Sequence, residues 1–405
     1  LPTALVEIRG TIRAGGFVHA LAETYVNFDT EELLAYVPLA FALAMADTRL
    51  MLLGDARIEA GAGASLRSDS EVYVSAVDVG TFFKISLSLS SAIVTAETKT
   101  VVTDAASVTA EGDVTLDARS RVSVEAASIA GPTDVAAQGA KSGVFVSVSV
   151  VLAETGVYVG NYDGGTGSTA SVTSKNGDIL ANADGLLRNK TYAVSSPVSI
   201  YMDEAGSPGV NQQSDQTVSP VSVITLVETV AGRRSTGVSG LRAKLVSKIT
   251  GSNSLGSLFN KGAAEEGDAF DAPPSTQAVG AFAIAVADNV VEARIDTAGS
   301  VSAANGALSL QSHGETASRS RADGSLYNNS TIAFIPGYGR FQITNEATST
   351  AAGIAACIAV TNHTAAAEIV SGTVSAGTGL TVAALNRTVD SSAISKSGHI
   401  PSTGK

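Results

Sequence analysis

The sequence predicts an all-β fold, a parallel β-helix (β-solenoid) in which the chain stacks coil upon coil. Three observations predict it: an apolar composition with few aromatic side chains, a recurring sequence unit, and a two-residue alternation of apolar and polar residues. We expect residues 1–405 to form one continuous solenoid array. Because the chain starts at Leu1 without an initiator Met, we also expect it to be a fragment of a longer chain.

The composition favours a narrow, regularly stacked interior. Hydrophobic residues make up 44% of the chain, yet aromatic residues reach only 5% and Trp is absent, so the apolar content is mostly Ala, Val, Ile and Leu. Charged residues make up 16%, below the roughly 25% of ordinary soluble domains. The surface must then be rich in Ser, Thr, Asn and Gly, which favours an extracellular protein over a cytosolic enzyme.

Charge and hydropathy exclude several classes of partner and site. The net charge of −12 argues against nucleic acid, which needs a basic surface. The most apolar stretch, Leu33 to Met45, is too short to span a membrane and is expected to be a buried strand. A single cysteine, Cys357, excludes an internal disulfide framework and a cysteine zinc site.

The recurring unit is an apolar strand, a second strand opening with Val or Ile, a Gly-containing turn and another alternating strand. Copies of the second strand open at Ile12, Ile58, Val108, Val172, Val301 and Val374. The first four lie roughly 45 to 65 residues apart, and the gap before Val301 is about twice as long. We therefore expect a diverged copy around Val223 to Ile249. Variable connections between similar units are typical of solenoids, which place insertions outside the stack.

Alternation within each unit predicts short strands. Val114, Leu116 and Ala118 share one face, and Val122, Val124 and Ala126 repeat the pattern. Strands of about four to eight residues predict a coil of about 20 residues, and a rise of about 4.8 Å per coil then predicts a rod of roughly 80 to 100 Å. The competing all-β interpretation is a string of sandwiches, but these normally have larger aromatic core residues.

Two insertions are expected to leave the array, at about 201–220 and 232–280. The first is rich in Gly, Gln, Ser and Pro and is expected to bulge outward. The second contains apolar residues at helical spacing, Val238, Leu241, Leu245, Val246 and Ile249, and Leu255, Leu258 and Phe259 extend the stripe. It predicts one short amphipathic helix near 238–250, laid over the solenoid.

The cadence from Ile358 to Val382 (IAVTNH, AEI, VSAGTG, LTV) resembles the repeat region of leukotoxin-type filamentous adhesins. It is similar more broadly to giant secreted β-solenoid surface proteins of Gram-negative bacteria, and the resemblance covers most of the chain except 200–280. It implies a right-handed β-helix exported to the cell surface, with a function in length, stiffness and contact. It transfers no catalytic residues.

Two groups of residues are candidate partner contacts, and each has a plainer alternative. The basic run has no acid between Ala231 and Thr250 and is either a solvated helix face or an electrostatic contact with an acidic neighbour such as the 265–271 loop of another copy. The aromatic group forms either an exposed patch for a protein or glycan, or a turn packed on the rod. The basic run is Arg233, Arg234, Arg242, Lys244 and Lys248, and the aromatic group is Tyr327, Phe334, Tyr338 and Phe341.

No catalytic, cofactor or metal site is predicted. The histidines (His19, His313, His363 and His399) are far apart in sequence and are expected to be solvated loop or turn residues, and Cys357 is expected to be a small buried hydrophobe. Asp163 to Ser168 resembles half of a calcium-binding turn, and residues 265–271 form an acidic loop. Calcium binding stays open, although a Gly-rich turn and a solvated loop are the simpler interpretations.

The predicted function is structural or adhesive: an extracellular, cell-surface repeat segment, part of a giant adhesin or filament, and not an enzyme. We expect self-association, head-to-tail or lateral, into fibres, with host or neighbouring cell surfaces or glycans as further partners. The alternative is a secreted repeat module that binds glycans or calcium. A solenoid enzyme that cleaves polysaccharides is the third and least favoured hypothesis, because such enzymes need clustered carboxylates and the acids here are scattered.

Overall fold

The computed structural model describes residues 2–30, 39–80, 85–130, 142–194, 276–324 and 350–397, with the short pieces 326–327, 331–335, 339–343 and 399–400. These residues are almost entirely β-strand, and the pairing between coils is parallel throughout. The predicted all-β solenoid is confirmed. Its right-handed sense stays a prediction, and the predicted helix near 238–250 lies outside the described residues.

Each coil consists of a long strand, a short tip strand and a second long strand. The first four coils are β1 (Thr3–Ile8), β2 (Thr11–Ala14) and β3 (Val18–Asp29); β4 (Leu39–Leu52), β5 (Arg57–Ala60) and β6 (Ala64–Gly80); β7 (Ile85–Val102), β8 (Ser107–Ala110) and β9 (Val114–Ala130); and β10 (Ser142–Gly160), β11 (Ser171–Ser174) and β12 (Ile179–Val194). In the last two coils the first long strand runs on into the tip: β13 (Thr276–Ala303) and β14 (Ala307–Asp323), then β18 (Thr350–Ala376) and β19 (Gly379–Lys396).

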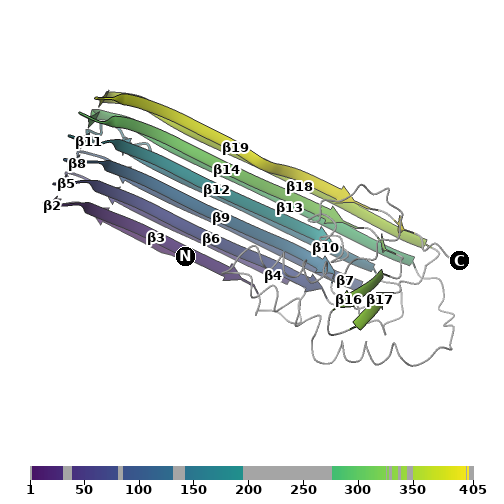
Figure 1. Cartoon of the computed structure of the whole chain (residues 1–405). Coiled ribbons are helices and arrows are strands. Elements are labelled where there is room, and N and C mark those ends of the chain that lie inside the picture. The colour runs from purple at the N-terminus through teal and green to yellow at the C-terminus, as the bar shows by residue number, and fades with distance from the viewer. Residues whose placement is uncertain are drawn as a thin grey trace.

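The coils build two sheets that face each other. Sheet A contains the first long strands and all the tip strands, and sheet B has the order β19-β14-β12-β9-β6-β3. Figure 1 shows the strands stacked from the N-terminal coil to the C-terminal coil, with the tip strands β2, β5, β8 and β11 gathered at one end. Strands β3, β6, β9 and β12 end, and strands β4, β7, β10 and β13 begin, at the opposite end, which we call the connection end.

The predicted repeat alignment is confirmed residue by residue. Ile12 pairs with Ile58, Ile58 with Val108, Val108 with Val172, Val172 with Val301, and Val301 with Val374. The diverged copy expected around Val223 to Ile249 is wrong, because β11 pairs directly with β13 and β12 with β14, which leaves no place for an intervening coil.

The predicted coil size and rod length are also wrong. Sheet A strands β4, β7 and β10 are 14, 18 and 19 residues long, and at about 3.3 Å per residue they extend roughly 45 to 60 Å. Six coils at about 4.8 Å per step give a stack only about 24 Å high between the first and last coils. The described array is therefore broader than it is tall.

Small side chains let the two sheets pack closely. One cluster at the tip end contains Leu52, Ile58, Val108 and Val172, and a second one further along contains Val74, Val94, Val124 and Leu187. Between the sheets, buried hydroxyl groups bond across the gap: Ser68 Oγ donates to the Lys99 carbonyl oxygen at 2.7 Å, and Thr100 Oγ1 donates to that of Asp117 at 2.7 Å. Ser and Thr are thus part of the core.

Backbones of neighbouring coils approach closely at the tip turns. A Cβ atom on Gly306 would lie 2.1 Å from the Gly177 carbonyl oxygen of the coil below, so no larger residue fits without movement of the backbone. The glycines of the recurring unit therefore serve the contact between coils as well as the turn.

Of the predicted insertions, 201–220 lies wholly outside the described residues. So does 232–280 except Thr276 to Gly280, which belong to β13. A further connection, between β14 and β18, contains the antiparallel pair β16 (Thr331–Ile335) and β17 (Gly339–Ile343), and β15 (Leu326–Tyr327) pairs with β20 (His399–Ile400) near the C-terminus.

Candidate functional site: the end coils and the outer face

The first and last described coils each leave one edge without a neighbouring strand. Among the strands that the structure describes, β1, β2 and β3 of the first coil pair only with β4, β5 and β6, and β18 and β19 of the last coil pair only with β13 and β14. An unpaired parallel edge presents backbone N–H and C=O groups that can bond another strand. Both ends of the described array can therefore accept a further coil.

Equivalent apolar residues of successive coils stack on one another in columns through the interior. The last residue of a column is exposed where the column reaches an open edge. Ile58, Val108 and Val172 are fully buried, whereas Ile12 in the same column is 37% exposed. At the other end Leu380 is 52% exposed, although Leu308, its neighbour in the column, is 1% exposed. Burial of these side chains would gain about 25 cal/mol for each Å² of apolar surface removed from water.

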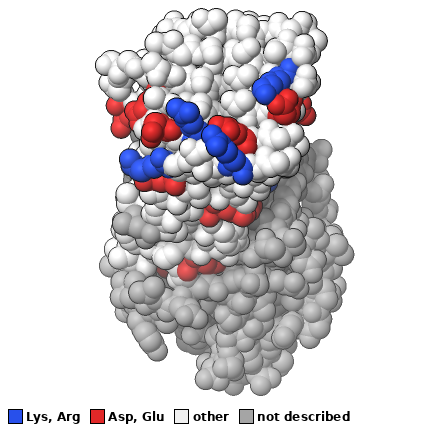
Figure 2. Space-filling view, turned by 90° about the vertical axis from the view of Figure 1, so that its left-hand side faces the viewer, with Lys and Arg blue, Asp and Glu red and all other residues white. Residues whose placement is uncertain are grey.

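The tip of the C-terminal coil carries no charge that would oppose stacking. Residues 369–386 contain no Asp, Glu, Lys or Arg. In Figure 2, which looks at the tip end, the charged side chains lie across the middle of the described surface and the uppermost part is white.

Lower on this tip, Arg13 pairs with Glu59 at 2.8 Å and Lys175 with Glu111 at 2.5 Å. These four residues line an open hollow of about 540 Å³.

The outer face of sheet A carries a ladder of ion pairs between coils. Arg49 Nη2 lies 2.7 Å from Glu97 Oε2, and Lys99 Nζ lies 2.6 Å from Glu97 Oε1 and 2.7 Å from Glu154 Oε1. The Lys99 side chain is only 8% exposed, and its ammonium also lies 5.3 Å from the centre of the Tyr162 ring. Three consecutive coils are joined by this ladder.

Charges in the ladder shift one another's pKa values. Burial of the Lys99 ammonium opposes its charge, but the hydrogen bonds and attraction of Glu154 and Glu97 outweigh burial and raise the pKa of Lys99. Burial likewise opposes ionisation of Glu97, but Lys99 and Arg49 outweigh it and lower the pKa of Glu97. Burial and the nearby carboxylate of Glu292, which accepts a hydrogen bond from the hydroxyl at 3.1 Å, raise the pKa of Tyr158. All three groups thus keep their ordinary charge near neutral pH.

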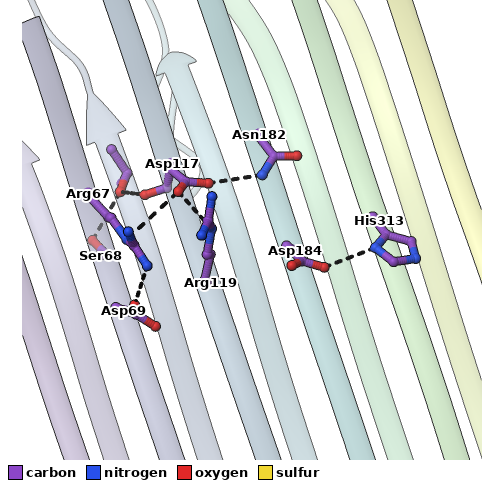
Figure 3. Close-up of polar contacts among 9 residues, drawn as sticks. Arg67, Ser68, Asp69, Asp117, Arg119, Asn182, Asp184 and His313 are labelled. Atoms are coloured by element: carbon purple, nitrogen blue, oxygen red, sulfur yellow. Dashed lines mark hydrogen bonds and ion pairs between the residues drawn. The ribbon is translucent and has the colours of Figure 1, made fainter.

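Sheet B carries a second polar network, shown in Figure 3. The carboxylate of Asp117 in β9 accepts a hydrogen bond from the Asn182 amide at 2.9 Å. It also forms ion pairs with Arg119, whose Nε lies 2.8 Å away, and with Arg67, whose Nε lies 3.8 Å away. Further along, His313 Nδ1 lies 3.0 Å from Asp184 Oδ1. The Asp117 contacts with Arg67 and Asn182 and the contact between His313 and Asp184 join neighbouring coils, whereas Arg119 and Asp117 lie in the same strand. The contacts between coils stabilise the stack.

The predicted partner contacts are only in part within the described residues. The basic run lies wholly outside them, as does Tyr338. Tyr327, Phe334 and Phe341 fall in β15, β16 and β17, where the register sets Phe334 opposite Arg340 and Ala333 opposite Phe341. The ladder around Lys99 was missed, because only the parallel register reveals that Arg49, Lys99 and Glu154 are neighbours.

The expectation that the histidines lie in loops or turns is wrong. All four lie in strands, and the ring nitrogens of His363 in β18 are buried against Gly314, where a Cβ atom would meet His363 Nε2. Burial lowers the pKa of His363 and raises that of the Cys357 thiol, which is half-buried. Both residues sit in the alternating pattern of β18, so strand membership decided their environment.

Asp163 to Ser168 form a turn between β10 and β11. Asp163, Gly164 and Gly167 have positive φ angles, and the Ser168 amide donates to Asn161 Oδ1 at 2.9 Å. Across the described ranges no three His, Cys, Asp or Glu side chains lie close enough together to hold a metal ion. The acidic loop 265–271 lies outside the described residues.

Within the described ranges we find no helix with the length and apolarity needed to cross a lipid bilayer. No protein-family model, no curated protein and no solved structure matches the chain.

Proposed function

We propose that this chain is a structural or adhesive repeat segment of a giant extracellular surface protein or filament, and that it performs no catalysis. The observation that supports the proposal most strongly is the register itself: equivalent residues of six coils stack in unbroken columns that emerge at two open edges. An array of this kind gains length by adding coils without a new core.

A second copy of this chain fits the open edges. The column that ends at Ile369 begins at Ile8, the column that ends at Val374 begins at Ile12, and the column that ends at Leu380 begins at Val18. If the C-terminal coil of one molecule stacks on the N-terminal coil of the next, each column continues with an apolar residue. Head-to-tail assembly into fibres is the partner arrangement we propose.

Sedimentation velocity over a range of concentrations, with negative-stain imaging, tests the assembly. We expect growth into fibres for the native chain and its loss for Leu380→Lys, because an interior-facing charge in the edge column opposes stacking. Thr381→Lys is the matched control, since Thr381 pairs with Ser309 on the outer face of the same strand. A native chain that stays a monomer at every concentration, or equal behaviour of the two variants, would contradict head-to-tail stacking.

Extracellular location has its own test. The low share of charged residues and the Ser- and Thr-rich strands support a secreted surface. Protease treatment of intact cells should remove the protein while cytosolic markers stay intact. Protection from protease until the cells are lysed would contradict a location at the cell surface.

A further inference from the structure

Four polar contacts between coils share one geometry. In each of them a donor side chain binds a carboxylate on the following coil, and the acid comes two residues before the donor's register partner. Arg49 is the register partner of Lys99 and binds Glu97 at 2.7 Å. Lys99 is in turn the register partner of Gly156 and binds Glu154 at 2.7 Å. We call this spacing the diagonal offset.

The diagonal offset recurs on both sheets up to the last coil. The Tyr158 hydroxyl donates to Glu292 at 3.1 Å, and Glu292 comes two residues before Arg294, the register partner of Tyr158. On sheet B, Arg319 Nη2 lies 2.5 Å from Asp390, again two residues before its register partner. Long side chains on neighbouring strands can reach such diagonal positions. Together the four contacts link each coil from the second to the last.

Two other arginines have an acid at the diagonal offset that a different side chain binds. Arg121 has Asp184 at this offset, and Arg188 has Glu315. Each of these acids is paired instead with a side chain of the coil that follows it. An acid without such a partner is therefore the one best suited to a diagonal contact.

The last coil presents a donor with no coil beyond it. The Arg387 side chain in β19 is 64% exposed, and its Nη1 lies 3.7 Å from Glu315 Oε2, which is too long for a hydrogen bond. The described array ends at β18 and β19, so it offers no following strand with an acid at the diagonal offset. The guanidinium has five N–H donors and can bind a further carboxylate.

The first coil presents the matching acid. The register column that ends at Arg387 begins at Tyr25. If the first coil of another copy stacks on the last coil, Glu23 lies at the diagonal offset from Arg387. Glu23 is exposed, and its register partner within the molecule is another acid, Asp69. In the described part of the chain no side chain forms an ion pair or hydrogen bond with Glu23.

We infer that Arg387 of one copy binds the Glu23 carboxylate of the next copy, and that this ion pair fixes the direction and register of the junction. The inference rests on the proposed head-to-tail assembly and adds the side chains that select one end for the other. With a junction shifted by two residues, the position at the diagonal offset would be Leu21 or Tyr25, and neither carries a negative charge at neutral pH.

Charge reversal and mixing test the pair. Arg387→Glu alone sets two acids against each other at every junction, and Glu23→Arg alone sets two cations against each other. In sedimentation velocity each variant should assemble about five- to tenfold more weakly than the native chain. An equimolar mixture of the two variants should recover assembly, because every junction of an alternating fibre again joins opposite charges. Recovery by mixing also shows that both variants fold.

Arg188→Glu is the matched control for the mixing experiment. It makes the same change of charge at an exposed position in the middle of the array, so assembly should stay unchanged. An equal loss with this control, or a mixture no better than the single variants, would overturn the ion pair while leaving head-to-tail stacking supported by the native chain. A native chain that does not assemble would remove both proposals.

A zero-length cross-link gives a second readout without charge reversal. Arg387→Lys keeps the positive charge, and a carbodiimide should condense the introduced ammonium with the Glu23 carboxylate into an amide, with loss of water. In a mixture of isotope-labelled and unlabelled copies, mass spectrometry of the digest should find this linked peptide pair with one labelled and one unlabelled member. Linkage to Glu315 alone, or to Glu23 only within one copy, would overturn the inference.

Discussion

Val172 in β11 and Val301 in β13 are direct neighbours in a parallel ladder, although the insertion of residues 195–275 lies between them in the chain. Both are buried, at 0% and 1% exposure. Coils on either side of the insertion therefore share one core, and the insertion leaves the stack without interrupting it.

An alanine substitution in the column that contains Val172 should destabilise the protein most where coils cover the side chain on both sides. Ile58→Ala removes a fully buried side chain between two coils and should cost about 2 to 5 kcal/mol of unfolding free energy. Ile12→Ala changes the same column at the open edge, where the side chain is 37% exposed, and should cost clearly less. Chemical denaturation of both variants measures the difference. Equal losses would mean that the first coil is covered on both sides.

Gly160 at the end of β10 should not tolerate a side chain. Its φ is +112°, and a Cβ atom would lie 1.9 Å from the Asp296 carbonyl oxygen of the next coil. Gly160→Ala should therefore cost upwards of about 2 kcal/mol, through both strain and displaced backbone. Gly54→Ala is the control: φ is +66° with open space around it, so the cost should be about 1 kcal/mol. Thermal melting compares the two, and a milder effect at Gly160 would contradict the packing of these coils.

The ladder around Lys99 should make stability depend on pH. Because the folded state lowers the pKa of Glu97, its contribution is present above the ordinary pKa, about 4.3, and is lost as pH falls through the lowered value. Because the folded state raises the pKa of Lys99, its contribution is present below about 10.4 and is lost as pH rises through the raised value.

Lys99→Met should remove the effect at high pH and weaken the effect at low pH, where Arg49 still pairs with Glu97. The variant leaves Glu97 and Glu154 facing each other without the shared cation and should cost about 1 to 3 kcal/mol at neutral pH. Since acidification then relieves their repulsion, the variant should lose less stability than the native protein between pH 6 and about pH 3. Lys175→Met, which removes an exposed pair with Glu111, is the control and should change little. A parallel pH profile for Lys99→Met and the native protein would exclude the proposed ladder.

The repeat alignment was predictable from the sequence, whereas the coil size was not. A strand opening with Val or Ile and followed three to five residues later by a Gly turn identified Ile12, Ile58, Val108, Val172, Val301 and Val374 as equivalent. The structure pairs them in that order. The short-strand prediction failed at residues such as Ser70 and Ser120. These interior-facing polar residues interrupt the apolar pattern but not the strand, because Ser70 bonds Thr98 across the core at 2.6 Å.

The surface features of the array could not be predicted from the sequence alone, because they depend on the register between strands. Lys99 and Glu154 are far apart in sequence. The outward row of Phe41, Ser91, Val148, Ile284 and Ile358 likewise contains one residue from each of five strands of sheet A. A pattern search along the chain sees the alternation of Phe41 and Leu43 with alanines but not their neighbours in other coils. The apolar stretch at Ile354 to Val360 was apparent in sequence, yet its continuity with Phe282 to Val286 is a property of the stack.

A disulfide between coils tests the central claim most directly. Thr173 and Ser302 pair in register next to Val172 and Val301 on the outer side of the tip. In a Cys357→Ala background, the double variant Thr173→Cys, Ser302→Cys should oxidise to a disulfide, seen by mass spectrometry of the digested protein. Thr173→Cys with Ser300→Cys, two residues out of register, should remain reduced. Efficient bonding at position 300 with none at 302 would contradict direct stacking of these coils across the insertion.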